Sequence, residues 1–187
     1  MTERYIGIKF RTKKLGNLSK DKQIETSALL LNKILATLPE ECLKGIAGNV
    51  SAKLSDGIII SASGSSLKNL IILDDYCKVT SRYNDRIVEY YGNKIPSSET
   101  KLHQLIYSER KDVQFVFHIH IPNLEKLQLL NRYPITKRFF PYGTINLAKE
   151  AVKALGSNNI VILKNHGIVI VGEKLENIIS NFRQITI

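Results

Sequence analysis

The dipeptide Asp56-Gly57 is the feature that most constrains how this chain can fold. It separates two short apolar segments, residues 50–54 and 58–62, and Asp-Gly in such a position is a strong signal for a tight β-hairpin. Hairpins join antiparallel strands. The sheet of this protein is therefore expected to be antiparallel or mixed.

A second hairpin is predicted further along the chain. Residues 76–81 and 87–91 are both strand-like, and the polar stretch 82–85 lies between them. Apolar residues recur at helical spacing in residues 21–38, and Pro39 marks the end of that helix. Other helices are expected to open at Pro96, to span 144–155 and to begin at Leu175, and other strands to cover 5–10, 113–121, 160–164 and 168–171. Strands joined by hairpins and interleaved with helices predict a mainly antiparallel sheet flanked by helices.

Chain length and composition favour one globular domain over residues 1–187, with residues 1–20 as an N-terminal extension. Charges interrupt the longer apolar stretches, so no membrane span is expected, and the first residues lack the apolar core of a secretory signal. Cys42 and Cys77 are too few and too far apart to suggest a disulfide framework. A soluble cytoplasmic protein is the expectation.

The net charge of +10 raises the question of nucleic-acid binding. Basic residues are scattered, however, and the densest cluster is confined to residues 9–14. The sequence contains no ladder of aromatic and basic residues and no recognisable nucleic-acid motif. We interpret the excess as a lysine-rich solvated surface and expect no nucleic-acid partner.

His118 and His120 occupy alternate positions of the apolar segment 113–121, so both imidazoles should face the same side of a strand. Imidazoles held side by side on a rigid element suit a divalent transition metal such as zinc. His166 lies between Asn165 and Gly167, in a tight turn that would expose its side chain at a strand end. A histidine pair on a strand can also be purely structural.

Glu99 is expected in the first turn of the helix that opens at Pro96. The helix dipole favours a carboxylate there, so this residue is either a helix-start charge or a ligand and base. His103 follows four residues later and can share its helix face. This histidine is a candidate for binding metal, for orienting Glu99 or for packing beneath it.

Three segments have the small and hydroxyl-bearing residues that suit an anion. They are Gly48-Asn49-Val50-Ser51, the stretch 61–66, and Ser97-Ser98 at a predicted helix start. Backbone N–H groups in such turns and at helix N-termini bind phosphate. Each segment alone is typical of an ordinary loop, but together they predict a phosphate pocket beside the metal.

These motifs, in this order, resemble the class II aldolase/adducin family, from about Asp21 to the end of the chain. The matching motifs are Gly48-Asn49-Val50-Ser51, Ser61-Ala62-Ser63-Gly64, Pro96-Ser97-Ser98-Glu99 with His103, Ile106-Tyr107 with Arg110, Asp112 and Val113, His118-Ile119-His120, Pro141-Tyr142-Gly143-Thr144 and Asn165-His166-Gly167.

The resemblance implies a three-layer α/β/α fold with a central, mainly antiparallel sheet, and a homotetramer with active sites at subunit interfaces. It implies a zinc-dependent aldolase, a lyase that cleaves a phosphorylated ketose to dihydroxyacetone phosphate and an aldehyde. The implied zinc ligands are His118, His120 and His166, with Glu99 as the fourth ligand at rest and the acid/base group in turnover. The implied phosphate-binding residues are Asn49, Ser63, Gly64, Ser97 and Ser98.

The chain departs from the aldolase pattern between His120 and Pro141, where it is shorter. Family aldolases carry there a tyrosine that donates a proton in a neighbouring subunit's site, and Tyr133 and Tyr142 are the candidates for replacing it. Three alternatives therefore stay open. They are a sugar-phosphate epimerase, a dehydratase like methylthioribulose-1-phosphate dehydratase, and a non-catalytic adducin-like scaffold.

Overall fold

The structure is a computed structural model that describes residues 7–82, 84 and 86–185. Its strands are β1 (Arg11–Gly16), β2 (Asn49–Leu54), β3 (Gly57–Ser61), β4 (Tyr76–Thr80), β5 (Ile87–Tyr91), β6 (Phe115–Ile119), β7 (Ile160–Leu163) and β8 (Gly167–Gly172). Its helices are α1 (Lys22–Leu35), α2 (Thr100–Glu109), α3 (Leu124–Leu129), α4 (Ile145–Leu155) and α5 (Leu175–Ile185), with a 3₁₀ turn at Glu40–Leu43.

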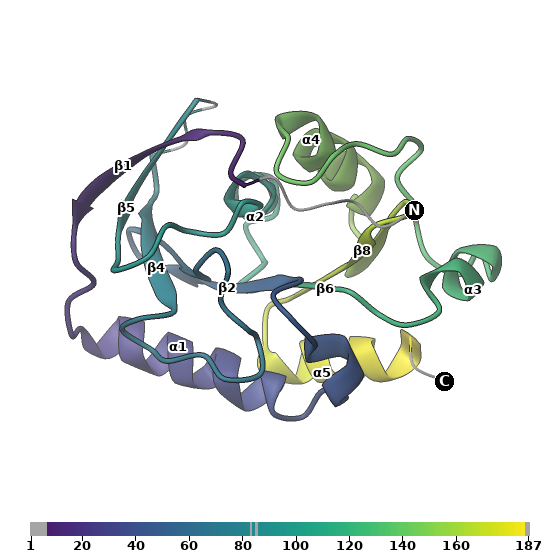
Figure 1. Ribbon diagram of the computed structural model, residues 1–187. Coiled ribbons are helices and arrows are strands. Elements are labelled where there is room, and N and C mark those ends of the chain that lie inside the picture. Colours follow the sequence, from purple (N-terminus) through teal and green to yellow (C-terminus); the bar gives the residue numbers. More distant parts are fainter. Residues whose placement is uncertain (1–6, 83, 85, 186–187) are drawn as a thin grey trace.

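Within the described residues, eight strands form one sheet in the order β1-β5-β4-β3-β2-β6-β8-β7. Neighbouring strands are antiparallel except for β1, which pairs with β5 in parallel. Helices α1 and α5 cover one face of the sheet, and α2 and α4 lie together on the other (Figure 1). The predicted three-layer α/β/α architecture is confirmed. Treatment of residues 1–187 as one domain with an extension at 1–20 stays a prediction.

The central strands are buried on both faces. In β8, Ile168 and Ile170 belong to the apolar cluster beneath α1 and α5, whereas Val169 and Val171 belong to the cluster beneath α2 and α4. This alternation follows from the two-residue period of a strand. His118 in β6 pairs with Val169 and therefore faces the α2 side of the sheet.

The predicted hairpin at Asp56-Gly57 is present, with its turn one residue earlier in the chain. Leu54 pairs with Gly57, so Ser55 and Asp56 form the two-residue loop and Gly57 begins β3. A Cβ atom on Gly57 would lie 2.1 Å from the carbonyl oxygen of Val79 in β4. Only glycine permits that approach between the strands.

Helix α1 forms as its apolar spacing predicts. Asp21 is the N-cap, and its carboxylate accepts hydrogen bonds from the backbone N–H groups of Gln23 and Ile24. The buried residues of this helix are Ile24, Ala28, Leu31, Ile34 and Leu35, which share one face. That face packs on the sheet near β2 and therefore helps to fix the strand that leads out of the Gly48-Asn49 motif.

The N-terminal strand expected at residues 5–10 can be checked only at residues 7–10. Residues 1–6 are outside the described range, residues 7–10 form no strand, and β1 is the basic segment Arg11–Gly16. An edge strand needs only backbone pairing on one side, so lysine and arginine side chains can remain in water. Helix α3 and the 3₁₀ turn at Glu40–Leu43 were not anticipated, because each is too short to display a helical period.

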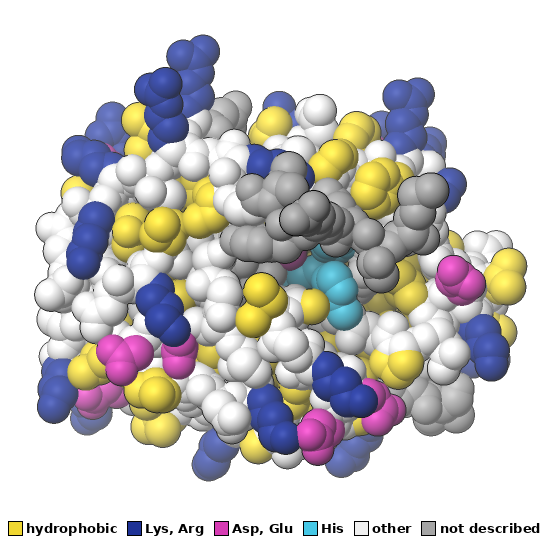
Figure 2. Space-filling model, in the orientation of Figure 1, with side chains coloured by type: hydrophobic (Ala, Val, Ile, Leu, Met, Phe, Trp, Pro, Cys, Tyr) yellow, Lys and Arg dark blue, Asp and Glu magenta, His cyan; other side chains and the backbone are white. Residues whose placement is uncertain are grey.

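Lysine and arginine side chains are spread around the face of the molecule drawn in Figure 2. This distribution agrees with a solvated basic surface. Among the residues that the structure describes, no helix has both the length and the apolar character needed to span a bilayer.

Candidate functional site

A cavity of about 350 Å³ opens beside the N-terminus of α2 and the end of β6. Of the site residues predicted from sequence, it is lined by Asn49, Ser63, Gly64, Ser97, Ser98, Glu99, His120 and His166. His118 is fully buried next to them. Figure 2 shows histidine side chains at the bottom of a hollow on this face. We call His118, His120, His166 and Glu99 the floor of the cavity. The residues expected from sequence to bind phosphate are called its phosphate wall: Asn49, Ser63, Gly64, Ser97 and Ser98.

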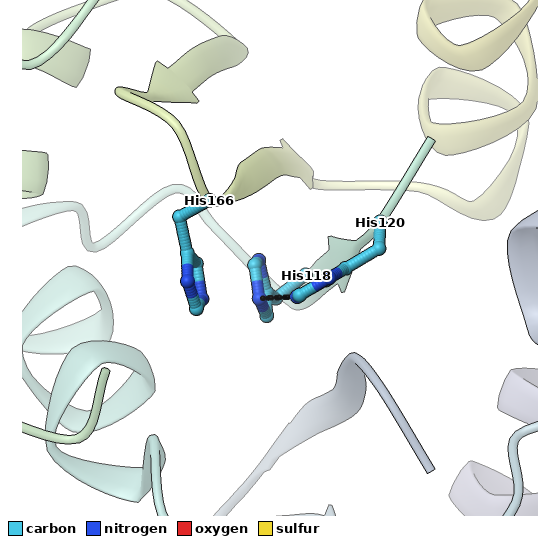
Figure 3. Close-up of side chains that lie close together, drawn as sticks. All are labelled: His118, His120 and His166. Atoms are coloured by element: carbon cyan, nitrogen blue, oxygen red, sulfur yellow. Dashed lines mark hydrogen bonds between the residues drawn. The ribbon is translucent and has the colours of Figure 1, made fainter. Parts of the chain in front are cut away.

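The three floor histidines come together although His166 is far from the other two in sequence. One ring nitrogen from each lies within 4.8 Å of the others. The Nε2 atoms of His118 and His120 are 3.1 Å apart, and the rings of His118 and His166 are stacked with their centroids 4.9 Å apart (Figure 3). His103 lies outside this group.

His118 presents its Nε2 atom to the other floor residues. Its Nδ1 lies 3.0 Å from the carbonyl oxygen of Ile168 in β8. A carbonyl only accepts hydrogen bonds, so Nδ1 carries a proton, and Nε2 is the ring nitrogen that faces the cavity floor. A backbone partner of this kind is the usual support for a metal-ligating imidazole.

The Asn165-His166-Gly167 motif has a geometric explanation. Asn165 adopts the left-handed conformation, with φ of 57°, and so turns the chain between β7 and β8. A Cβ atom on Gly167 would lie 2.9 Å from Cε1 of His118. Glycine at this position therefore lets β8 pass directly beside the histidine cluster.

Glu99 is the N-cap residue of α2, one position earlier than the first turn, and its side chain makes no capping hydrogen bond. Its carboxylate turns instead to the histidines: Oε2 lies 3.0 Å from His118 Nε2, and Oε1 lies 3.2 Å from His166 Nε2. Burial alone would raise the pKa of this carboxyl, but the neighbouring His118 and His166 hold it well below its usual range. A helix-start charge does not account for this arrangement.

The floor fits a divalent metal ion. Two ligand atoms bound to zinc at 2.0–2.1 Å in tetrahedral geometry are separated by about 3.3 Å. The adjacent donor atoms of the floor are 3.0–3.2 Å apart. Burial, followed by the charges of His118 and His166, lowers the pKa of His120 to about 3, so that imidazole is neutral, as a metal ligand must be.

Two loops that are distant in sequence form the phosphate wall. The Ser63 N–H donates to the carbonyl of Ile95, and the Ser97 N–H donates to the carbonyl of Ser61, at 2.8 and 3.2 Å. Ser97 Oγ in turn accepts from the Glu99 N–H at 3.3 Å. The loop after β3 and the loop before α2 are thereby joined into one surface beside the floor.

Asn49 has contacts that sequence reasoning did not anticipate. It lines the cavity, yet its Nδ2 donates to Glu99 Oε2 at 2.9 Å, and its Oδ1 lies 2.6 Å from His103 Nε2. His103 is fully buried, and this burial lowers its pKa to about 3. The histidine of α2 thus contacts the floor through Asn49.

Of the two candidate tyrosines, Tyr142 lines the cavity and Tyr133 is absent from its lining. The Tyr133 hydroxyl donates to the carbonyl of Gln184 near the end of α5. Ile46 and Asn165 also line the cavity and were not predicted as site residues. Their adjacency to the Gly48-Asn49 and His166-Gly167 motifs is the only sequence signal that could have identified them.

Comparison with known proteins identifies the family. Residues 39–185 match the sequence profile described as Class II Aldolase and Adducin N-terminal domain. The chain belongs to the class II aldolase and adducin family. This match covers the elements from the 3₁₀ turn through α5 and includes every floor and wall residue.

Two relatives within the class II aldolase and adducin family carry specific names. A 5-methylthioribulose-1-phosphate/5-deoxyribulose-1-phosphate aldolase of Rhodospirillum rubrum is 30% identical over 153 residues, which are 71% of this chain and 64% of that protein. This chain thus spans less than two thirds of that relative. An L-fuculose phosphate aldolase of Methanocaldococcus jannaschii is 31% identical over 148 residues, 70% of this chain and 75% of that protein.

The fold comparison agrees with the family. A solved L-fuculose 1-phosphate aldolase superposes with a TM-score of 0.71 at 22% sequence identity, over 90% of this chain and 84% of that one. The class II aldolase fold predicted from the motifs is confirmed. The expected likeness to L-fuculose-1-phosphate aldolases is borne out, since proteins of that name are among both the relatives and the structural neighbours.

Proposed function

We propose that this protein is a zinc-dependent aldolase that reversibly cleaves a phosphorylated ketose to dihydroxyacetone phosphate and an aldehyde. The observation that carries the proposal is the convergence of His118, His166 and Glu99 beside a wall of small residues at a helix N-terminus. A metal site and an anion site within one cavity suit a substrate that has both a reacting carbonyl and a phosphate.

Zinc held by the floor would supply a Lewis acid that stabilises the negative charge developing as the carbon–carbon bond breaks. His118, His120 and His166 would be its protein ligands, with Glu99 as a fourth. Because neutral imidazoles add no negative charge, the ion would retain most of its own. The hydrogen bond from His118 to the Ile168 carbonyl holds that ring in the required tautomer.

Glu99 would transfer the proton. In cleavage, the electrons of the broken bond stay with the dihydroxyacetone phosphate fragment, and the carbon that holds them takes up a proton. In the reverse reaction a base removes the same proton before the aldehyde is attacked. A carboxylate such as Glu99, which lines the cavity together with the wall residues, would lie next to that carbon if the wall bound the phosphate.

The substrate phosphate would be bound by Asn49, Ser63, Gly64, Ser97 and Ser98. Ser97 and Ser98 immediately precede the N-terminus of α2, where backbone N–H groups and the helix dipole favour an anion. Asn49 uses one N–H of its amide for Glu99 and has a second that can donate to the phosphate. Tyr142, which lines the same cavity, is the candidate proton donor to the aldehyde fragment.

The assembly and location that belong to this proposal are a homotetramer in the cytoplasm. Exposed apolar side chains offer surface for subunit contacts, with Leu129 84% exposed and Leu130 52% exposed. Cys42 and Cys77 are both unpaired and buried, as is usual in a compartment that keeps thiols reduced.

A test needs metal analysis followed by a substrate panel. The purified protein should contain zinc and should release dihydroxyacetone phosphate from L-fuculose 1-phosphate, 5-deoxyribulose 1-phosphate or 5-methylthioribulose 1-phosphate. These substrates are chosen because the named relatives act on phosphorylated ketoses of these types. Zinc without release of dihydroxyacetone phosphate from any of them would refute the aldolase.

The same samples separate the alternatives. A dehydratase would consume 5-methylthioribulose 1-phosphate without forming dihydroxyacetone phosphate, and an epimerase would interconvert pentulose 5-phosphates. A protein that binds neither metal nor sugar phosphate would be an adducin-like scaffold. The intact set of Glu99 and three histidines argues against that last reading, because a scaffold has no need of converging metal ligands.

A further inference from the structure

We propose that His103 is a positioning residue, which fixes the side-chain amide of Asn49 and through it the carboxylate of Glu99. The proposal rests on the proposed function, in which Glu99 transfers the proton. It assigns a role to a buried histidine that neither binds the metal nor touches the substrate.

The contacts form one continuous chain from the cavity into the core. Glu99 Oε2 accepts from Asn49 Nδ2 at 2.9 Å, and Asn49 Oδ1 lies 2.6 Å from His103 Nε2. His103 Nδ1 lies 2.6 Å from Ser51 Oγ, which lies 2.8 Å from the Tyr107 hydroxyl. Each contact is within normal hydrogen-bond length.

The donors and acceptors of this chain can be assigned one after another. Asn49 donates to Glu99 through Nδ2, so its Oδ1 faces His103 and can only accept. His103 must therefore carry its proton on Nε2, which leaves Nδ1 as an acceptor for the Ser51 hydroxyl. Ser51 then accepts from Tyr107, whose hydroxyl lies closer to Ser51 Oγ, at 2.8 Å, than to the carbonyl oxygen of Gln114, at 3.4 Å. The orientation of the catalytic carboxylate and the tautomer of His103 determine each other.

The spacing of the strand and the helix explains why these residues meet. Asn49 and Ser51 are two residues apart in β2, which separates them by about 6.6 Å, and both face α2. Glu99, His103 and Tyr107 are four residues apart on α2, which separates neighbours by about 6 Å. The two repeats nearly match, so strand and helix side chains alternate along the chain of hydrogen bonds.

Because these side chains are buried, each needs its partner in this chain of hydrogen bonds. Ser51 and His103 are fully buried, and Asn49 and Tyr107 are only 4% and 6% exposed, so water has little access to replace a missing partner. Burial also keeps His103 neutral and raises the pKa of Tyr107, so the assigned protonation pattern persists across the working pH range. An apolar residue in place of His103 would leave the Asn49 carbonyl free to rotate away from its present direction.

Two variants of His103 separate positioning from packing. His103→Leu fills the space but offers no donor, whereas His103→Gln can both donate to Asn49 and accept from Ser51. The zinc-loaded proteins are compared for exchange of the reacting C–H proton of dihydroxyacetone phosphate with solvent deuterium. His103→Leu should slow this exchange by roughly 10–100-fold while metal content is retained, and His103→Gln should restore most of it. Equal rates in wild type and His103→Leu would overturn the proposal, as would equal slowing by both variants.

The ring ¹⁵N chemical shifts of His103 in the wild-type protein provide a test that needs no activity and no variant. The expected spectrum is that of a neutral ring with its proton on Nε2. A proton on Nδ1 would refute the assignment even if the aldolase is active. Conversely, wild-type protein that exchanges no proton but has the Nε2–H tautomer would refute the proposed function, while the hydrogen-bond chain would stand.

Discussion

The floor and the phosphate wall lie side by side in one cavity but are built in different ways. Floor side chains such as His118 and Glu99 are almost completely buried, and their donor atoms point at one another. In the wall, Asn49, Ser97 and Ser98 are buried as well, but Ser63 is half-buried, Gly64 is exposed, and two loops are held together by backbone hydrogen bonds. The floor therefore depends on particular side chains, whereas the wall depends on small residues and chain geometry.

Because of this difference, substitutions in the floor and in the wall should have different effects on the enzyme. Changes in the floor should alter the chemical step or metal binding, and changes in the wall should alter substrate affinity. Substrate preference can then diverge between relatives through the wall while the floor is retained. The named relatives, a methylthioribulose-type aldolase and fuculose phosphate aldolases, suit such a division.

Glu99→Gln should give the largest effect on turnover. The amide keeps the size of the side chain but cannot take a proton, so kcat should fall by roughly 10²–10⁴-fold. Metal content should stay near that of the wild type, because three imidazoles remain. Steady-state kinetics and metal analysis check this together, and unchanged kcat would remove the proton-transfer role.

Ser98→Ala in the wall should instead raise KM. A lost hydrogen bond to a charged group costs about 1.5–3 kcal/mol, which corresponds to at least a tenfold increase, with little change in kcat. Ser66→Ala is the matched control, because Ser66 belongs to the serine-rich stretch 61–66 but does not line the cavity. An equal effect of both substitutions, or an effect on kcat alone, would argue against a phosphate site here.

Acid should destabilise the metal-free protein. The pKa values of His103 and His120 are lowered from 6.5 to about 3, mainly by burial. Above pH 6.5 neither ring is charged in the folded or unfolded state, so neither affects stability. Between pH 6.5 and 3 the unfolded chain binds protons that the folded chain does not, so the free energy of unfolding falls as pH falls.

Urea unfolding of the chelator-treated protein at several pH values measures this dependence. In His103→Gln the free energy of unfolding should fall less steeply between pH 6.5 and 3. The slope should be smaller by about the contribution of one bound proton, because glutamine does not titrate. Parallel pH profiles for the variant and the wild type would show that His103 is not held neutral by the fold.

The grouping of the floor residues was predicted better from the sequence than the strand at the edge of the sheet. The alternation of His118 and His120 on an apolar strand is a local pattern, so their shared face followed directly from strand geometry. His166 and Glu99 could be named as candidate partners from the sequence, but their approach to the pair depends on strand order and on the turn at Asn165, which no local pattern predicts. The β2–β3 hairpin was predictable from its turn residues, apart from a shift of one position.

Other features depend on tertiary context that the sequence does not express. β1 consists of basic residues and is a strand because the edge of β5 is available for pairing. His103 could be placed on the helix face of Glu99, but its link through Asn49 depends on the alignment of β2 with α2. A sequence pattern defines faces of single elements, whereas these contacts arise between elements.

Metal binding to the floor tests the central claim most directly. Apo-protein is titrated with zinc by calorimetry, in parallel with the variant His120→Ala. In the wild type, the side chain of His120 follows directly after β6 and lines the cavity. The wild type should bind one ion per chain, and the variant should lose more than the roughly 10–100-fold in affinity that removal of an outer partner costs. Zinc affinity that is absent in the wild type, or equal in the two proteins, would contradict the account.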